Sequence, residues 1–487
     1  MRAWAVLAAI GVALGAGACT RVNPDYCSRP GPCGDGRVCD IDYNVCRLPD
    51  GGPGDAAPEA GADAAIDAPP ECRPATQAAD CTADAQKPIC VDGRCAGCTE
   101  DAQCLARDPA HPACASGACV QCTTALHCAG SADGPICDTT ARACGPCARD
   151  EQCAAASYAP GVCVGGGCPD ADGVLWVAGG ATGCTDSGTG AQAAPFCSIG
   201  AAASYAKSTA GAPPVVVVAP AAMPYPSFEV KGSLVVVGAA GGDEVVVNGD
   251  ASHPAASLAA SGGTVTLRRL HLHGGTPAVV SCTATTCTLE QLAIEGGTVG
   301  VQATSAPLVT VRRSQIWGNP GGGISTLASD FEVVNNFIYL NGLYTSAIGA
   351  ASFFQTSSDA TKRFVNNTVW LNLGQGAAVA CQSMTAATVL NGIVWQNTHT
   401  GGAVSSVAGC DVSHTLTDDP AVAGLGDNPA STPPPLFVST TAPAFDLHLQ
   451  AGSGGLGIGG PGAPADDIDG EPRPAGRIDL GADQITP

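Results

Sequence analysis

The sequence predicts an all-β chain whose main part is a right-handed, single-stranded parallel β-helix (a solenoid), preceded by small disulfide-rich repeats. Three observations predict this class. Short aliphatic segments recur every 22 to 31 residues, asparagines occupy fixed positions in that recurrence, and cysteines recur in groups of four. The 64 glycines and 37 prolines are typical of many turns and short strands, so little helix is expected.

Six segments share one pattern around a central aliphatic residue. Consecutive central residues are 22, 22, 22, 31 and 25 positions apart. Alternate side chains of a strand point to opposite faces, and stacked coils lie roughly 4.8 Å apart, so these residues are expected to form an aliphatic ladder inside a solenoid. The central residues are Leu272, Ile294, Ile316, Ile338, Val369 and Val394.

Two sets of asparagines follow the same repeat. Asparagine tolerates left-handed backbone angles, and its amide can bond the equivalent residue one coil away. Two polar ladders at the bends between sheets are therefore predicted, with ordinary Asn-rich turns as the alternative. One set is Asn319, Asn341, Asn372 and Asn397, and the other, just before the strand, is Asn335, Asn366 and Asn391.

Motifs outside these coils extend the pattern in both directions. Gly173-Val-Leu-Trp-Val, Asp186-Ser-Gly-Thr-Gly and Ala194-Pro-Phe-Cys-Ser-Ile-Gly-Ala-Ala precede valine runs at 215–218, 235–237 and 245–247. Phe445-Asp-Leu-His-Leu and Asp467-Ile-Asp-Gly-Glu-Pro-Arg lie near the end. With these motifs, residues 173–484 resemble the pectin-lyase-like right-handed parallel β-helix proteins. The resemblance implies an entry segment with a capping helix, a β-helix over 173–430 and a closing segment over 431–487.

The same resemblance specifies architecture better than activity. Catalytic members cleave acidic polysaccharides, either by calcium-assisted elimination with an Arg or Lys base or by hydrolysis with paired carboxylates. Neither set is visible here. A base could be sought in Arg268, Arg269, Arg312 or Arg313, but Arg268, Glu290 and Arg312 share one slot 22 residues apart, and a ladder of paired charges is the simpler interpretation.

The N-terminus reads as a signal peptide over residues 1–18, with an apolar run from Ala3 to Leu14 that is too short to span a membrane. Small residues before Cys19 resemble a bacterial lipobox, although Ala16 stands where that pattern prefers Leu. Setting Cys19 aside leaves 26 of the 27 cysteines, an even number for pairing. We expect a lipid anchor at Cys19, with a secreted protein carrying a spare thiol as the alternative, and no other membrane contact.

The region before the solenoid is organised around cysteine. A short Cys-rich unit over 19–47 is followed by a linker over 48–71 that is rich in Pro, Ala, Gly and Asp. Residues 72–169 form four repeats of four cysteines, about 24 residues each, whose disulfides replace a core. Their connectivity is open, and zinc at pairs such as Cys95-x2-Cys98 is the less favoured alternative in an oxidising compartment.

Three further cysteine pairs are suggested by spacing alone. Cys184 with Cys197 would join the entry loop, Cys282 with Cys287 a turn between coils, and Cys381 with Cys410 two neighbouring coils.

The strongest candidate site is the outward position that follows each central aliphatic. Stacked aromatic rings on a flat sheet suit sugar C–H groups. Alternatively, the rings stack on each other or lie under the insertion over 341–363, where Phe353 and Phe354 could cover them. The candidate ligand-binding residues are His273, Trp317, Tyr339, Trp370 and Trp395, with Glu295 in the same row.

Two short motifs are given structural interpretations. His271-x-His273 offers only two ligands on one strand, so surface histidines are expected and not a metal site. Asp467-x-Asp469-Gly470 is expected to form a tight turn. No metal and no cofactor are expected.

With 21 basic and 43 acidic residues, the formal charge of −22 repels phosphate backbones, so nucleic-acid binding is not expected. The sequence favours a non-enzymatic, exported cell-surface protein, an outer-membrane lipoprotein or otherwise secreted, that binds a polysaccharide or a surface protein as a monomer. The alternatives are a β-helix polysaccharide lyase or glycoside hydrolase, and a structural cell-envelope spacer.

Overall fold

The computed structural model describes residues 38–40, 45–47, 71–211, 214–354, 362–382, 387–399 and 406–485. The chain divides into two compact units, Met1–Pro69 and Pro70–Pro487. In the first unit, strand β1 (Val38–Asp40) pairs antiparallel with β2 (Val45–Arg47). The predicted signal peptide, Cys19 and most of the predicted linker lie outside the described residues.

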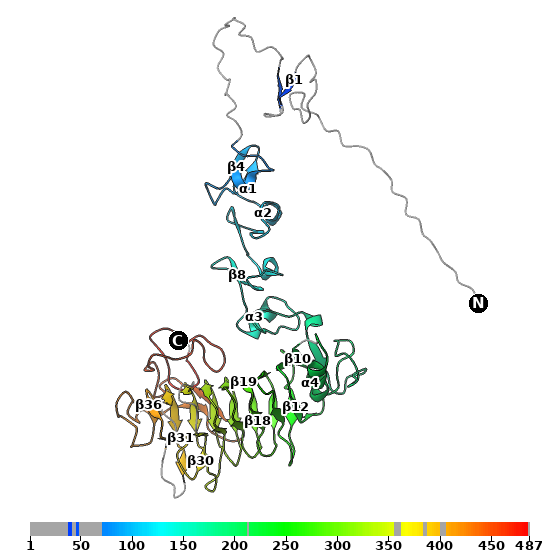
Figure 1. The fold of residues 1–487 in the computed structure, drawn as a ribbon. Helices are drawn as coiled ribbons and strands as arrows, with labels where there is room; N and C mark the ends of the chain where they lie inside the picture. The colour runs from blue at the N-terminus through cyan, green and yellow to red at the C-terminus, as the bar shows by residue number, and fades with distance from the viewer. Residues whose placement is uncertain are drawn as a thin grey trace, which may run out of the picture. The chain divides into compact units, whose positions relative to one another are not determined.

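The four Cys repeats at the start of the second unit each combine a short helix with a hairpin or bridge (Figure 1). In order, the elements are α1 (Gln77–Asp80), β3 (Ile89–Val91), β4 (Arg94–Ala96), α2 (Asp101–Arg107), β5 (Ala113–Ala115), β6 (Ala118–Val120), η2 (Ala125–Cys128), β7 (Ile136–Asp138), β8 (Ala143–Gly145) and α3 (Asp150–Ala155).

Within each repeat, the first cysteine bonds the third and the second bonds the fourth, which settles the connectivity that the sequence left open. Cys95 and Cys98, the pair considered for zinc, belong to different repeats and bond Cys81 and Cys114. Their sulfurs are therefore not free thiolates. The pairs are Cys72–Cys90, Cys81–Cys95, Cys98–Cys114, Cys104–Cys119, Cys122–Cys137, Cys128–Cys144, Cys147–Cys163 and Cys153–Cys168.

The remainder is a parallel solenoid of three long sheets whose coils stack from β10 to β36 (Figure 1). Sheet A contains β9 (Leu175–Val177), β10 (Val215–Val218), β13 (Leu234–Gly238), β16 (Thr264–Arg268), β19 (Thr286–Glu290), β22 (Val309–Arg312), β25 (Phe331–Val334), β28 (Lys362–Val365), β32 (Thr388–Leu390) and β36 (Asp411–Ser413).

Sheet B contains β11 (Tyr225–Pro226), β14 (Val246–Asn248), β17 (His271–His273), β20 (Ala293–Glu295), β23 (Gln315–Trp317), β26 (Phe337–Tyr339), β29 (Thr368–Trp370), β33 (Ile393–Trp395) and β37 (Leu416–Thr417). Sheet C contains β12 (Phe228–Val230), β15 (Ala256–Leu258), β18 (Val280–Thr283), β21 (Val301–Thr304), β24 (Ile324–Leu327), β27 (Ala351–Phe354), β31 (Val379–Gln382) and β35 (Val407–Ala408).

The solenoid interior is the aliphatic ladder that the repeat predicts. In sheet B, Leu272 pairs with Ile294 and Ile294 with Ile316, and the register continues through Val394. All six predicted side chains are 0% exposed. Burying aliphatic groups of this size contributes roughly 1.5–3 kcal/mol each, so the ladder is the main source of the solenoid's stability.

At most corners from β16 onward, one residue takes a left-handed backbone conformation, and most of these residues are not glycine. After sheet A, these residues are Arg269, Gln291, Arg313, Asn335, Asn366, Asn391 and His414, hereafter the first corner. After sheet B they are Gly274, Gly296, Gly318, Leu340, Leu371 and Gln396, and after sheet C they are Ala284, Ser305 and Ala328.

In the later coils, the residue after the left-handed position carries the polar ladder. Asn319 donates its side-chain amide to Asn341 Oδ1 at 2.9 Å, and Asn341 and Asn372 donate in the same way to the next coil at 3.0 Å. The same oxygens accept the backbone N–H of the preceding coil, as Asn372 Oδ1 does from Asn341. The predicted ladder of Asn319, Asn341, Asn372 and Asn397 is present.

The second predicted ladder is displaced by one residue. Asn335, Asn366 and Asn391 take the left-handed angles but do not bond one another, because their side chains point out of the coil. The ladder is formed by Asn336, which donates to Asn367 Oδ1 at 2.9 Å, and it continues at Ser314.

The ends of the solenoid carry additional elements. Helix α4 (Ile199–Ser208) caps the entry after the turn η3 (Ala171–Gly173), and its N-cap Ser198 accepts a bond from Ala201. The other short strands are β30 (Leu373–Gly374), β34 (Thr398–His399), β38 (Phe437–Ser439) and β39 (Asp446–Leu449). Disulfides join Cys184 to Cys197, Cys282 to Cys287, and Cys381 to Cys410.

Among the described residues, no helix has the length and apolar character needed to cross a bilayer.

Replacing Asn341 by Ala should lower the free energy of unfolding by about 2–3 kcal/mol, because it leaves buried amide groups of two neighbouring coils without partners. Chemical denaturation followed by circular dichroism measures this. The matched control is Gln382→Ala, whose side chain is exposed on β31, and it should change stability by less than about 0.5 kcal/mol. Equal effects of the two substitutions would contradict a stabilising role for the ladder.

Candidate functional site

The predicted aromatic row exists as a register on the outer face of sheet B. Trp317 pairs with Tyr339, Tyr339 with Trp370, and Trp370 with Trp395. The rings of Trp317 and Tyr339 are stacked, with centroids 5.8 Å apart. His273, in the same row, is exposed.

This row is not an open stripe, and the expectation of an exposed aromatic surface is corrected here. Tyr339 and Trp370 are only 5% and 4% exposed, and Trp317 and Trp395 are half-buried. Burial raises the pKa of the Tyr339 phenol to about 12, and the carboxylate of Glu295 adds to this effect.

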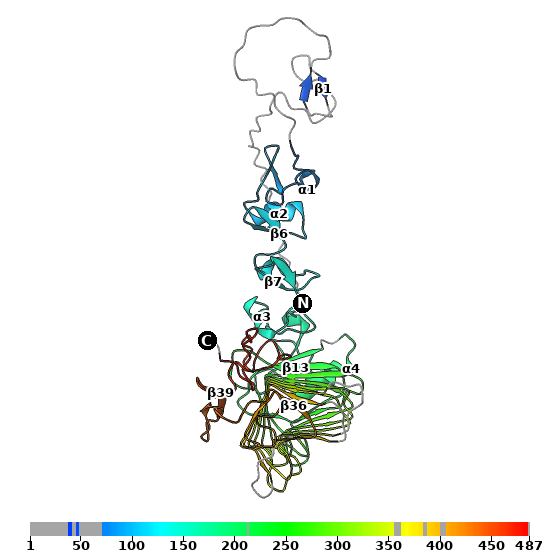
Figure 2. The ribbon, with the colours of Figure 1, turned by 90° about the vertical axis from the view of Figure 1, so that its left-hand side faces the viewer.

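The cover over the row is the C-terminal segment, and Figure 2 shows β39 beside the stacked coils. The Phe445 ring lies 6.0 Å from that of Tyr339 and 5.7 Å from that of Trp370. The predicted cover, Phe353, instead lies inside the solenoid on β27, where it stacks on Phe331 at 3.7 Å. Residues 355–361 of the insertion lie outside the described residues.

The closing segment is fixed to the first corner. The outward amides of Asn335, Asn366 and Asn391 donate to backbone carbonyls at Asp466, at Asp479 and Gly481, and at Gly460, respectively. Arg473 is 9% exposed and donates to Asn335 Oδ1 and to the carbonyls of Gly481 and Ala482. A single arginine thus ties the closing segment both to itself and to the solenoid.

The fourth Cys repeat is fixed to the earlier coils of the same corner. Asp150, at the start of α3 and 4% exposed, accepts from Arg268 at 2.9 Å and from Arg269 at 2.6 Å. Arg268 also donates to the carbonyl of Cys163, and Arg149 donates to the carbonyl of Gly470. The fourth repeat therefore contacts both the solenoid and the closing segment.

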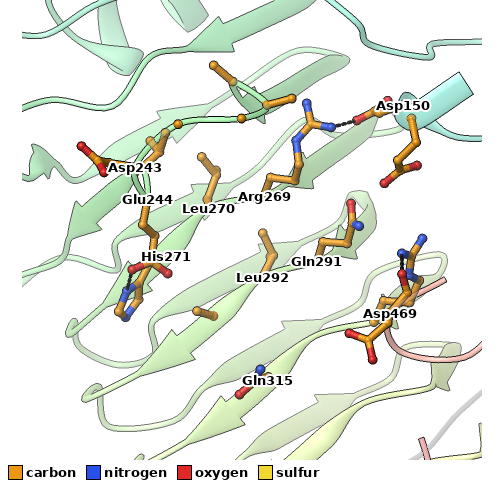
Figure 3. A pocket seen from close by; sticks show the side chains of 18 of the residues that line it. Asp150, Asp243, Glu244, Arg269, Leu270, His271, Gln291, Leu292, Gln315 and Asp469 are labelled. Atoms are coloured by element: carbon orange, nitrogen blue, oxygen red, sulfur yellow. Dashed lines mark hydrogen bonds and ion pairs between the residues drawn. The ribbon is translucent and has the colours of Figure 1, made fainter. Parts of the chain in front are cut away.

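Between these three parts lies a cleft of about 800 Å³. Its floor is the outer face of sheet B in the early coils, where Figure 3 shows His271 and Gln315. The fourth repeat contributes Asp150 and Glu151 to one wall, and the closing segment contributes Ile468 and Asp469. Trp317, the first ring of the aromatic row, also lines the cleft.

The cleft carries an excess of acidic groups. Five carboxylates line it, and Arg269 and Arg313 are the two arginines. His271 lies between two carboxylates, with its Nδ1 2.8 Å from Glu244 and its Nε2 2.9 Å from Glu295 on the next coil. The lining carboxylates are Asp150, Glu151, Asp243, Glu244 and Asp469.

The arginines considered as a lyase base are all engaged. Arg313 donates to the carbonyls of Ile468 and Asp469. Of the predicted charge ladder of Arg268, Glu290 and Arg312, only the pair of Arg312 with Glu290 forms, at 3.0 Å. Arg268 pairs with Asp150 of the fourth Cys repeat instead. Burial lowers the pKa of Arg269, an effect that the Asp150 charge opposes.

Sequence reasoning missed most of this cleft. Asp150, Gln291 and Asp469 belong to segments more than a hundred residues apart, and no repeat relates all three. The one signal was local: the first-corner slot carries polar side chains in every coil from Arg269 to His414.

A family model supports the architecture. Residues 252–415 match the family model described as the right handed beta helix region. This part of the chain is a right-handed β-helix. No curated protein matches the chain. The crystal structure of pectate lyase Pel9A aligns over 64% of this β-helix chain and 96% of its own, with 14% identity and a TM-score of 0.32.

Replacing Arg473 by Ala should release the closing segment from the β-helix, since hydrogen bonds to a charged group contribute about 1.5–3 kcal/mol each. Release would expose Trp370, so tryptophan emission should shift to longer wavelength. Arg477→Ala, in the same segment, is the control and should leave the emission unchanged. An unshifted spectrum in Arg473→Ala would show that this arginine does not hold the cover in place.

Replacing Asp150 by Ala should leave Arg268 and Arg269 buried without their carboxylate and cost about 3–5 kcal/mol of local stability. Limited proteolysis should then cut within residues 147–168 faster than in the unmodified protein. Asp172→Ala, at an exposed position, is the comparison variant. If both variants are cut at the rate of the unmodified chain, the Asp150 ion pairs do not dock the repeat.

Proposed function

We propose that this is an exported, non-enzymatic glycan-binding protein that holds a neutral glycan in the cleft. The observation that carries the proposal is the half-buried Trp317 ring inside an 800 Å³ cleft whose floor and walls also present Gln291 and Gln315. The disulfides of the described residues support an oxidising, extracytoplasmic location.

The chemistry of the lining suits a sugar chain. An indole face packs against sugar C–H groups, while side-chain amides can both donate to and accept from hydroxyls. Gln315 is exposed on β23, two residues before Trp317, so both side chains lie on the outer face of the same strand. A glycan on this floor would contact both.

The charge of the lining favours a neutral glycan over an acidic one. Five carboxylates face two arginines, and Arg269 is already paired with Asp150. A polyuronate would therefore meet net repulsion. The same arrangement argues against the alternative of a polysaccharide lyase, in which an arginine or lysine must be free to act as a base.

At the cell surface, the protein would be anchored through an acylated Cys19 or be secreted, and it would act as a monomer. The Cys repeats and the preceding linker would hold the β-helix away from the membrane. A structural cell-envelope spacer, the other alternative, would also lie at the cell surface but would bind no ligand.

One observation favours a second candidate, a glycoside hydrolase or lyase. His271 and Glu244 line the cleft, and Glu295 on the next coil bonds the other ring nitrogen of His271, so an imidazole lies between two carboxylates, and such groups can exchange protons. This candidate predicts product release, whereas the binding proposal predicts retention without turnover.

The test is affinity electrophoresis of the full chain in gels that contain a soluble glucan, mannan, galactan or polygalacturonate, with reducing-end release followed in parallel. Retardation by a neutral polysaccharide without release is expected. Trp317→Ala and Gln315→Ala should each weaken retardation about tenfold, which corresponds to about 1.4 kcal/mol.

Gln302→Ala, on strand β21 of sheet C and outside the cleft, is the matched control and should bind as the unmodified protein does. Reducing-end release that requires Glu295 would replace the binding proposal by the enzymatic one. Absence of retardation in every gel, or equal loss in Gln315→Ala and Gln302→Ala, would reject the cleft as a glycan site.

A further inference from the structure

A second cluster of chemically active side chains lies in the closing segment and shares Asp469 with the lining of the cleft. It consists of His448 on β39, Asp469 in the turn after Ile468, and Asp483 near the end of the described chain. One ring nitrogen of His448 and one carboxylate oxygen of each aspartate lie within 4.8 Å of one another. We propose that this cluster binds a Zn²⁺ ion.

The histidine has the surroundings of a metal ligand. Its Nδ1 bonds Asp446 Oδ1 at 2.5 Å, and its ring packs edge-on against Phe337, with centroids 5.0 Å apart. These two contacts fix the ring so that Nε2 faces Asp469 Oδ2 at 2.9 Å. A carboxylate that holds the far nitrogen of an imidazole is the usual partner of a zinc-binding histidine, because it orients the ring and increases its basicity.

The two carboxylates are held in place by a shared scaffold. Asp467 is fully buried and accepts from the backbone N–H groups of Asp469, Glu471 and Gln484. It therefore joins the turn that carries Asp469 to the C-terminal stretch that carries Asp483. Asp483 Oδ2 in turn accepts from the N–H of Leu449, the residue after His448.

The ligand set selects the metal. One imidazole nitrogen and two carboxylate oxygens suit Zn²⁺, which binds them at roughly 2.0–2.2 Å and can complete its shell with water. Calcium prefers six or more oxygen ligands, so it fits this set less well. The Asp469 side chain is 55% exposed, which gives an ion access from solvent.

Binding of Zn²⁺ would replace one proton of the His448 imidazole. With both ring nitrogens bonded to carboxylates, the imidazole is protonated, and Zn²⁺ takes the position of the Nε2 proton, which is released to solvent. The ion would join β39, the turn at Asp469 and the C-terminal stretch at Asp483. It would therefore fix the part of the closing segment that forms one wall of the cleft.

Isothermal titration of the chelator-treated full chain with ZnCl₂ tests the proposal. A single-site isotherm and a higher melting temperature are expected. His448→Ala and the conservative Asp469→Asn should each weaken zinc affinity at least tenfold. Circular dichroism establishes that the variants are folded, and Asp469→Asn, at an exposed position, provides the test if His448→Ala does not fold.

The matched control is His253→Ala. His253 also pairs with an aspartate, Asp250, at 3.0 Å, but both are exposed, and among the described residues they belong to no group of three possible metal ligands. This variant should bind zinc as the unmodified chain does. Absence of zinc binding, binding unaffected by both cluster variants, or a CaCl₂ isotherm as tight as that of ZnCl₂ would overturn the proposal.

Discussion

A solenoid coil has to bend three times while its backbone amides remain buried, and a buried N–H or C=O without a partner costs about 1–3 kcal/mol. At the bends of the later coils, one residue takes a left-handed conformation, and the next residue, an Asn or Ser, turns a polar side chain into the coil. That side chain accepts the N–H of the equivalent residue in the preceding coil. After sheet C, Ser329 takes the place of the asparagines and accepts from the N–H of Ala306. This rule holds neighbouring coils in register.

The rule has a consequence for the outside of the solenoid. Because the second residue points inward, the left-handed residue before it points outward, and after sheet A these outward side chains form a line of Arg, Gln and Asn. Early in that line, Arg269 binds Asp150 of the fourth Cys repeat. Later, Arg313, Asn335, Asn366 and Asn391 bind the closing segment. The cleft lies between the two additions.

The repeat made the β-helix predictable, since a 22-residue spacing of aliphatics and asparagines fits stacked coils and no sandwich. The one-residue error in the second ladder arose because asparagines are adjacent at 335–336 and 366–367, and only the backbone angles decide which of the two faces inward. The aromatic row was placed in the correct register, but its cover was not predictable. Phe437 and Phe445 belong to no repeat, and their contacts with Trp370 join segments more than sixty residues apart.

The central claim is that the first corner holds the fourth Cys repeat and the closing segment in fixed positions. Hydrogen exchange of the unmodified full chain, resolved by mass spectrometry, tests this most directly. Amides of residues 466–484 should be protected to a degree comparable with the strands of sheet B, since their donors bond groups such as the Asn391 carbonyl and Thr368 Oγ1. Exchange of that segment at the rate of an unstructured chain, beside a protected solenoid, would contradict the account.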